Sequence, residues 1–276
     1  MPDALVTPFP AGETHASRPL IRVSGVGKVY QNGTVALADV NLTIAPGEFV
    51  SLLGPSGCGK STLLRLIAGL GPVSGGTIDW PLSHYDARGE PTRDLGFVFQ
   101  EPTLMPWATV ADNVYLPLKL AGIGRHAATS RIEQALAMVK LARFAGAYPR
   151  ELSGGMKMRV SIARAVVVKP KILLMDEPFA ALDEITRFRL NDDLLRLWQE
   201  QRWTVVFVTH SVFESVYLSS RIVVMSSRPG RIVGEVTIGA PYPRSDSFRT
   251  SRVYNGFCRL TSAALAQAMA GAEDEE

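Results

Sequence analysis

Short apolar runs alternate with longer segments of helical periodicity along most of the chain. Three of the runs, EFVSLLG (48–54), LGFVFQ (95–100) and KILLMDE (171–177), have the length and continuous hydrophobicity of buried strands. The segment 183–201 has instead the spacing of a long amphipathic helix. Strands that alternate with helices predict an α/β fold with a mostly parallel sheet. Further strands are expected at 20–30, 35–44, 76–80, 203–210, 221–226 and 231–238, and further helices at 61–70 and 211–219.

The middle of the chain, from about residue 101 to 168, breaks this alternation. It carries helical patterns and no convincing strand. It is therefore predicted to be a helical lobe inserted into the α/β core. One amphipathic face is expected within residues 125–143, formed by Ile132, Leu136 and Val139 and continued by Phe144.

The composition excludes several classes of protein. A chain of 276 residues with 46% hydrophobic content can bury a core as one large domain or as two lobes. Charged residues interrupt the most apolar segment, 160–175, so no membrane-spanning helix is expected. The net charge of +3 is mild and no dense run of Lys and Arg occurs. A nucleic-acid partner is therefore not expected.

The cysteines and the N-terminus indicate the compartment. Cys58 and Cys258 are the two cysteines, and they predict no disulfide framework. Residues 1–19 are rich in Pro and Ala and lack a basic start followed by an apolar core, so they are expected to be a flexible tail and not a signal peptide. Free thiols without a signal peptide favour a reducing, cytoplasmic compartment.

The segment GPSGCGKST (54–62) matches the phosphate-binding pattern G-x-x-x-x-G-K-[ST] in full. It follows an apolar strand and opens a helix, which disfavours the alternative of a Gly-rich turn without a ligand. Its backbone N–H groups and the helix N-terminus are expected to bind phosphate. Lys60 would reach the terminal phosphates and Ser61 would donate a ligand to Mg²⁺. The expected nucleotide-binding residues here are Gly54, Pro55, Ser56, Gly57, Cys58, Gly59, Lys60, Ser61 and Thr62.

Two carboxylates follow the apolar run at 172–175. Asp176 should emerge at the carboxyl edge of its strand, where open α/β sheets bind ligands, and hold Mg²⁺ through water. Glu177 should point elsewhere and can orient or deprotonate the water that attacks a γ-phosphate. The alternative is that these acids simply end the strand and face solvent.

Several single residues are weaker candidates when taken alone. Gln100 and His210 each end an expected strand and could reach the metal, the water or a γ-phosphate, but strand-end polar residues are more often structural. Tyr30 could stack on a base or could be a half-buried strand aromatic. Ser211 and Glu214 fit an S-x-x-E capping box, which is a purely structural role.

Taken in order, these motifs resemble those of an ABC-transporter ATP-binding subunit over about residues 20–235. GPSGCGKST resembles the Walker A loop, LLMDE the Walker B strand, and VFQEP, with Gln100, the Q-loop. LSGGM (152–156) resembles the ABC signature, AALD, with Asp183, the D-loop, and VTH, with His210, the switch histidine. No short motif is decisive alone, but the ordered set is specific.

The resemblance implies a P-loop ATPase core with an N-terminal antiparallel β subdomain and an inserted helical subdomain. The ATPase domain would span 20–236, with the helical subdomain at about 101–168. A C-terminal helical extension with an acidic tail would follow at 237–276. By resemblance, Tyr30 and Val35 line the base pocket. The catalytic residues would be Glu177, His210, Gln100 and Lys60, and the Mg²⁺ ligands Ser61, Gln100 and Asp176.

Such subunits work as head-to-tail dimers, in which each ATP lies between one subunit's Walker A loop and the partner's LSGGM. Ser153 can also N-cap the following helix, and the glycines then leave its first N–H groups open to a phosphate. A Ser-Gly cap without any ligand is the alternative. The resemblance implies that the partner's nucleotide is contacted by Ser153, Gly154, Gly155, Met156 and Asp183.

The residues of the motifs and their flanks most resemble those of the nitrate/sulfonate/taurine importer branch. That resemblance implies hydrolysis of ATP with Mg²⁺ by a homodimer at the cytoplasmic face of the plasma membrane. Two separate permease subunits would carry a small, anionic solute delivered by a substrate-binding protein. No regulatory domain is expected after residue 236. A non-transport ABC ATPase, an exporter ATPase and a subunit that does not hydrolyse ATP are the alternatives.

Two further features remain open at this stage. Leu104, Met105 and Trp107 could line the groove that receives a permease, or could be lobe core. Many relatives have glutamine after LSGG and an acid after the switch histidine. Here Met156, with Met158 beyond it, and Ser211 take these places, and the methionines could alter contacts around the bound nucleotide.

Overall fold

The structure is a computed structural model, and it describes residues 18–83, 91, 94–227 and 229–273. Two sequence predictions lie largely outside these residues. They are the N-terminal tail as far as residue 17 and the acidic end from residue 274.

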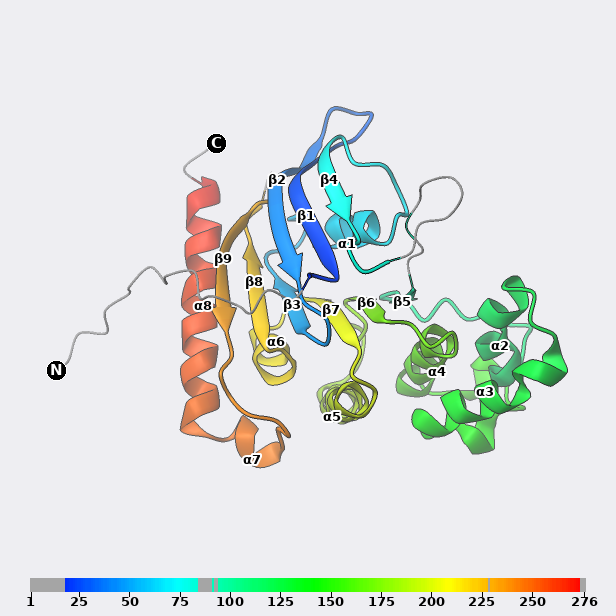
Figure 1. Cartoon of the computed structure of the whole chain (residues 1–276). Helices are drawn as coiled ribbons and strands as arrows, with labels where there is room; N and C mark the ends of the chain where they lie inside the picture. Colours follow the sequence, from blue (N-terminus) through cyan, green and yellow to red (C-terminus); the bar gives the residue numbers. More distant parts are fainter. Residues whose placement is uncertain (1–17, 84–90, 92–93, 228, 274–276) are drawn as a thin grey trace.

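A six-stranded sheet forms the centre of the molecule, in the order β5-β6-β7-β3-β8-β9 (Figure 1). All its neighbours pair in parallel except β8 and β9, so the predicted mostly parallel sheet is confirmed. The apolar runs at 48–54 and 171–177 lie within its middle, where every residue of β3, β6 and β7 is buried. The run at 95–100 forms β5 at the edge instead, where buried and partly buried residues alternate. Its strands are β3 (Phe49–Leu53), β5 (Leu95–Val98), β6 (Ile172–Asp176), β7 (Thr204–Thr209), β8 (Arg221–Met225) and β9 (Ile232–Thr237).

The two faces of this sheet bury different cores, as the alternation of side chains along a strand requires. In β7, Val205 and Phe207 join the core shared with α5 and the helical lobe, while Val206 and Val208 join the core around α1. Each such side chain contributes about 1.5–3 kcal/mol when it leaves water, so both faces need a cover. Helix α1 (Lys60–Ile67) covers one face, and α5 (Glu184–Gln201) and α6 (Val212–Leu218) lie on the other (Figure 1).

A second, three-stranded sheet lies on the far side of α1 and is antiparallel, in the order β2-β1-β4. It is the antiparallel β subdomain that the resemblance implied. Its strands are β1 (Ile21–Val29), β2 (Val35–Ile44) and β4 (Gly75–Asp79). Arg221 joins the two sheets, because its guanidinium binds Glu48 beside β3 and donates to the Thr43 carbonyl of β2.

The helical lobe occupies one end of the molecule (Figure 1). Its helices are α2 (Val110–Leu120), α3 (Arg125–Met138) and α4 (Gly154–Val166), with single 3₁₀ turns at Ala142–Phe144 and Pro149–Glu151. Ile132, Leu136 and Val139 are buried as predicted and Phe144 packs against the same core, although α3 ends earlier than expected. The lobe is therefore helical and buries the apolar face that the periodicity predicted.

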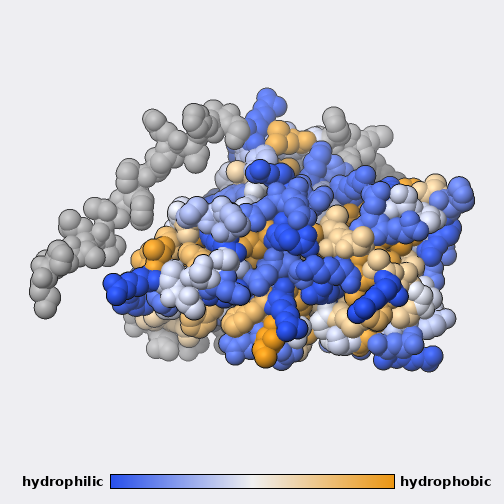
Figure 2. Space-filling view, turned by 90° about the horizontal axis from the view of Figure 1, so that it is seen from below, coloured by the Kyte–Doolittle hydropathy of each residue, from blue (hydrophilic) through white to orange (hydrophobic). Residues whose placement is uncertain are grey.

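The C-terminal part lies at the opposite end and contains α7 (Asp246–Arg249) and α8 (Arg252–Glu273) (Figure 1). Within the described part of the chain, every helix is too short or too polar to span a bilayer. Figure 2 shows the face that lies below in Figure 1, where hydrophobic residues are scattered among hydrophilic ones. Both cysteines are buried free thiols.

Arg244 attaches the C-terminal part to the core. Its side chain is buried and its guanidinium lies 4.0 Å from the centre of the Tyr242 ring. It donates to the carbonyls that end α6, where the helix dipole also favours a positive charge. The acceptors are the carbonyl oxygens of Val216, Tyr217, Ser219, Ile238 and Ala240.

Replacing Arg244 with Met is expected to lower the free energy of unfolding by about 3 kcal/mol, because buried carbonyls lose their donor. Urea unfolding followed by circular dichroism measures the change. Arg259→Met, at an exposed position of α8, is the matched control. Its free energy of unfolding should stay within about 0.5 kcal/mol of the wild-type value. Equal midpoints for both variants would contradict the anchoring role of Arg244.

Candidate nucleotide site

The loop between β3 and α1 has a shape set by its glycines and by Lys60. Gly57 and Gly59 have φ of 78° and 95°, in the left-handed region that favours glycine. The buried Lys60 ammonium donates to the carbonyls of Gly54 and Pro55 at 2.8 Å, so the loop curls around this cation. The predicted helix start is confirmed to within one residue, since α1 begins at Lys60.

This loop forms one wall of a cavity with a volume of about 400 Å³. Tyr30 and Val35, which flank the turn between β1 and β2, also line it and are 44% and 46% exposed. The Tyr30 hydroxyl lies 3.1 Å from Thr62 Oγ1. Tyr30 follows β1 and is exposed, so the half-buried strand aromatic considered above is wrong. Also lining the cavity are Gly57, Gly59, Lys60, Ser61, Thr62 and Glu177.

Three other members of the loop shape it without lining the cavity. A Cβ on Gly54 would lie 2.7 Å from the Met225 carbonyl oxygen, so only glycine fits against β8. Cys58 is buried, and burial raises the pKa of its thiol while the nearby Lys60 opposes this shift. Ser56 is exposed at the turn that follows Pro55.

Ser61 and Asp176 meet at the carboxyl edge of the central sheet. The Ser61 hydroxyl donates to Asp176 Oδ1 at 2.6 Å. Asp176 is 5% exposed, and burial raises its pKa although the Ser61 hydrogen bond opposes the shift. A hydroxyl and a buried carboxylate are hard oxygen donors of the kind that Mg²⁺ takes, and a divalent cation would offset the cost of burying this charge. These residues fit Mg²⁺.

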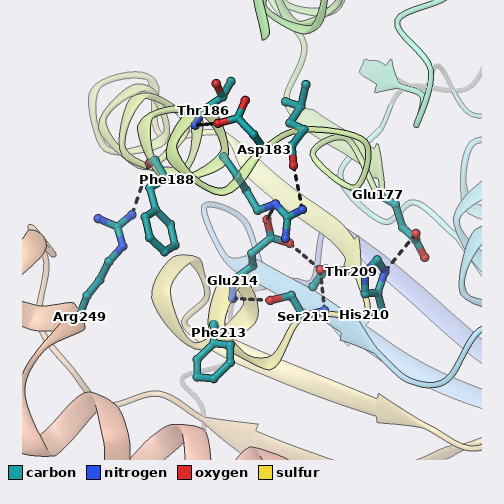
Figure 3. A network of polar contacts seen from close by, with 12 residues as sticks. Glu177, Asp183, Thr186, Phe188, Thr209, His210, Ser211, Phe213, Glu214 and Arg249 are labelled. Carbon is teal, nitrogen blue, oxygen red and sulfur yellow. Dashed lines mark hydrogen bonds and ion pairs between the residues drawn. The ribbon is translucent and has the colours of Figure 1, made fainter. Parts of the chain in front are cut away.

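Glu177 and His210 come together beside this pair. Glu177 has φ of 45°, which for a residue with a bulky side chain costs about 1–2 kcal/mol and turns it away from the direction of β6. Its N–H donates to the Val208 carbonyl, and its Oε2 lies 3.3 Å from His210 Nδ1 (Figure 3). The expectation that the two adjacent acids point to different places is confirmed.

Gln100 lies at the same edge of the sheet. It is exposed two residues past β5, and Val98 of β5 pairs with Met175 directly before Asp176. Parallel neighbours end on the same side, so Gln100 follows the strand edge that carries Asp176. Its metal and catalytic roles remain predictions.

The LSGGM segment opens α4 in the helical lobe. The Ser153 side chain accepts from the Met156 N–H at 3.3 Å, so the predicted N-cap is confirmed. Asp183 caps α5 in the same way, through the Thr186 N–H at 2.9 Å, and this backbone hydrogen bond lowers its pKa. A Cβ on Gly155 would lie 2.7 Å from Thr186 Cγ2, so the two caps pack against one another.

The two methionines of this helix differ in environment. Met156 is half-buried and packs against the main core. Met158 is 2% exposed within that core, so any effect of its side chain on contacts around the nucleotide would be indirect and stays a prediction.

The capping box predicted at Ser211 and Glu214 is half correct. The Ser211 side chain accepts from the Glu214 N–H at 3.3 Å, so Ser211 does cap α6. The Glu214 carboxylate does not return to Ser211, because it accepts from the Thr209 hydroxyl at 2.7 Å. Sequence reasoning missed this role for Glu214, and it missed Arg187, whose Nε lies 3.8 Å from Glu214.

A glycine-rich loop between a buried strand and a helix, with a hydroxyl–carboxylate pair beside it and a second carboxylate next to that pair, is the arrangement of a P-loop ATPase. The sequence model of the family described as ABC transporter matches residues 37–180. The chain belongs to the ABC transporter family and is an ATPase subunit that binds ATP.

Relatives with assigned names extend over most of the chain. The aliphatic sulfonates import ATP-binding protein SsuB of Bacillus cereus is 42% identical over 238 residues, which cover 84% of this chain and 92% of that protein. The nitrate import ATP-binding protein NrtD of Synechocystis sp. is 45% identical over 231 residues, which cover 82% and 85%. Membership of the importer ATPase family is therefore confirmed.

A solved structure has the same fold. It is the dimeric, post-hydrolysis state of the ATP-binding cassette MJ0796 bound to ADP and Pi, with 34% sequence identity and a TM-score of 0.67. The similarity covers 80% of this chain and 100% of that one. The predicted fold class is thereby confirmed.

Proposed function

We propose that this chain energises an importer as a homodimer, with each ATP between the Walker A loop of one copy and the LSGGM segment of the other. The observation that carries the proposal is that these two groups lie on separate surfaces. Of the described residues, those that line the cavity come from the phosphate-binding loop, Tyr30 to Ala36 and Glu177. Ser153 and Gly154 are exposed at the start of α4 and line no part of it.

The side chains of the cavity divide the chemistry among them. Lys60 and the loop N–H groups bind the phosphates, and Tyr30 with Val35 holds the base. Glu177 accepts the proton of the attacking water, and His210 holds the Glu177 carboxylate and the γ-phosphate in place. Ser61, Gln100 and Asp176 would hold Mg²⁺, which when bound would supply positive charge against the phosphates.

Exposed apolar side chains around Asp183 and His210 favour a second copy as the partner here. Ile185 and Phe188, which are 66% and 40% exposed, belong to the helix that Asp183 caps. Phe213, which is 61% exposed, follows His210 by three residues. Burying such side chains adds affinity to a surface whose phosphate contacts supply specificity.

A groove at the helical lobe fits the coupling segment of a permease. It has a volume of about 320 Å³ and lies between β5, the segment after Gln100, α2 and α4. Its apolar wall includes Phe97, Phe99 and Leu120, and Leu120 is 80% exposed. Arg164 of α4 forms its floor by donating to the carbonyls of Pro102 and Thr103 at 2.8 Å.

The three apolar residues after Gln100 divide between the two roles considered above. Trp107 is 78% exposed and is available to a partner. Leu104 packs against the main core, and the Met105 backbone is held by the Asn113 side chain. Docking at Trp107 stays a proposal, whereas Leu104 belongs to the lobe core.

Because α4 carries the LSGGM segment at its start and Arg164 near its end, a shift of the lobe on ATP binding would move the groove as well. Two membrane-spanning permease subunits would follow this motion at the cytoplasmic face of the plasma membrane. By analogy with the named relatives, the cargo is a small anion such as a sulfonate or nitrate, delivered by a substrate-binding protein.

Leu120→Glu is expected to reduce co-purification with a multi-span membrane protein from detergent-solubilised native membranes at least about tenfold, since a charge in an apolar contact costs more than 1.4 kcal/mol. Quantitative mass spectrometry after affinity capture of the tagged chain measures it. Leu70→Glu, at a position 61% exposed after α1, is the matched control. The proposal would be contradicted if Leu120→Glu recovered as much of the membrane protein as wild type does. It would also be contradicted if the wild-type chain captured no membrane protein.

A further inference from the structure

A chain of buried polar contacts joins the segment before Asp183 to the segment that carries His210 (Figure 3). Arg187 Nη2 donates to the Leu182 carbonyl at 3.0 Å, and Arg187 Nε lies 3.8 Å from Glu214 Oε1. The other Glu214 oxygen, Oε2, accepts from the Thr209 hydroxyl at 2.7 Å. Two segments that are distant in sequence are therefore connected by three side chains.

The Thr209 hydroxyl fixes the turn on which His210 stands. It donates to Glu214 and accepts from the Ser211 N–H at 3.0 Å, so it binds two groups that follow His210 and closes the turn around that residue. His210 lies between Thr209 and Ser211, and its ring reaches Glu177 Oε2 at 3.3 Å. Rotating the Thr209 side chain would release the turn and move the imidazole.

The central carboxylate is costly to keep in this place. Glu214 is 7% exposed and Thr209 3% exposed, and burial raises the pKa of Glu214 despite the Thr209 hydrogen bond and the nearby Arg187. Asn191 of α5 is also buried beside it. Apolar side chains could join α5 to α6 without a desolvation penalty. A carboxylate that accepts from one particular hydroxyl instead fixes the direction in which that hydroxyl points.

The contact with Arg187 is looser than the contact with Thr209. Glu214 Oε1 and Arg187 Nε are buried and make no hydrogen bond among the described residues, at a separation of 3.8 Å. A displacement of α5 by a few tenths of an ångström toward Glu214 would bring this ion pair to hydrogen-bond distance. The carboxylate is thus placed to respond to the position of α5.

We propose that Glu214 is a positioning residue, which links the turn at Leu182 and Asp183 through Arg187 to the orientation of His210. The inference rests on the proposed role of His210 in hydrolysis. When a second copy engages the Asp183 turn, the shift reaches the imidazole through Glu214 and Thr209. Hydrolysis then depends on contact between the copies, whereas binding of ATP by one copy does not.

Glu214→Gln tests this link in the purified chain, because the amide has the same size but lacks the charge that faces Arg187. The kcat for Mg-ATP is expected to fall about tenfold while KM stays within about twofold, as for a residue that acts on the geometry of the reacting groups. Thr209→Val, which removes the hydroxyl at nearly constant volume, should do the same. The double variant should be no slower than the slower single variant.

Ser211→Ala is the matched control. It removes the side-chain cap of α6, which lowers stability, but keeps the backbone N–H that donates to Thr209. Its melting temperature should fall while its kcat stays within about twofold of wild type. If kcat falls tenfold here too, loss of stability explains the effect and the inference is overturned.

His210→Ala separates this inference from the proposed function. If this variant hydrolyses ATP like wild type, the role of His210 fails and the inference fails with it. If it loses hydrolysis while Glu214→Gln and Thr209→Val keep wild-type kcat, only the link is wrong. Loss of hydrolysis in all three, with non-additive effects of Glu214→Gln and Thr209→Val, supports both.

Discussion

Glu177→Gln is expected to lower kcat for ATP hydrolysis by about 10²–10⁴-fold, the range that general-base groups contribute. The amide keeps the size of the side chain and its place on the strained backbone at φ 45°, but it cannot accept a proton. Lys60 and Ser61 are untouched, so affinity for ATP should stay within about threefold.

A steady-state phosphate-release assay measures kcat, and binding of a fluorescent ATP analogue measures affinity in the same preparation. Glu200→Gln is the matched control, because that carboxylate pairs only with Arg196 one turn earlier among the described contacts. Its kcat should equal that of wild type. Equal kcat for the two variants would show that Glu177 is not the base.

Ser153→Arg is expected to abolish hydrolysis that requires two copies, by at least about 100-fold, while one copy alone still binds ATP with near-normal affinity. The reason is geometric. Ser153 begins α4 on a surface that lines no part of the described cavity, so a bulky cation there can exclude only a nucleotide held by another copy.

The dimer is measured by size-exclusion chromatography with ATP in the Glu177→Gln background, where slow turnover keeps the nucleotide intact. Ser130→Arg, on the exposed side of α3 in the same lobe, is the matched control and should leave the ATP-dependent dimer unchanged. If Ser153→Arg weakens binding of ATP to a single copy as strongly as it weakens dimer formation, the composite site is wrong.

The parts of the site that local sequence encodes were predictable. The phosphate-binding loop requires glycines at fixed spacing between a strand and a helix, and all of these occur in nine consecutive residues. Asp176 could be placed beside Ser61 because ligands bind at the carboxyl edge of parallel strands. Both placements follow from backbone geometry, and the structure brings these two side chains within 2.6 Å.

Contacts between distant segments were not predictable in this way. The pattern S-x-x-E at Ser211 is the same whether Glu214 returns to the helix start or binds elsewhere. The choice depends on Thr209, which ends β7, and on Arg187, which reaches Glu214 only once α5 and α6 lie side by side on the sheet. Likewise, the sequence could not separate the partly buried Leu104, which packs against the core, from the exposed Trp107.

The packing of Gly155 against Thr186 limits how these proteins can diverge. Because the space for a Cβ at 155 is already filled by the Thr186 methyl group, a larger residue at the first position requires a smaller one at the second. Enlarging Gly155 therefore requires a compensating change at Thr186, which ties the segment around Ser153 to the segment around Asp183. A subunit grafted from a relative would keep this contact only where its residues at these two positions still fit each other.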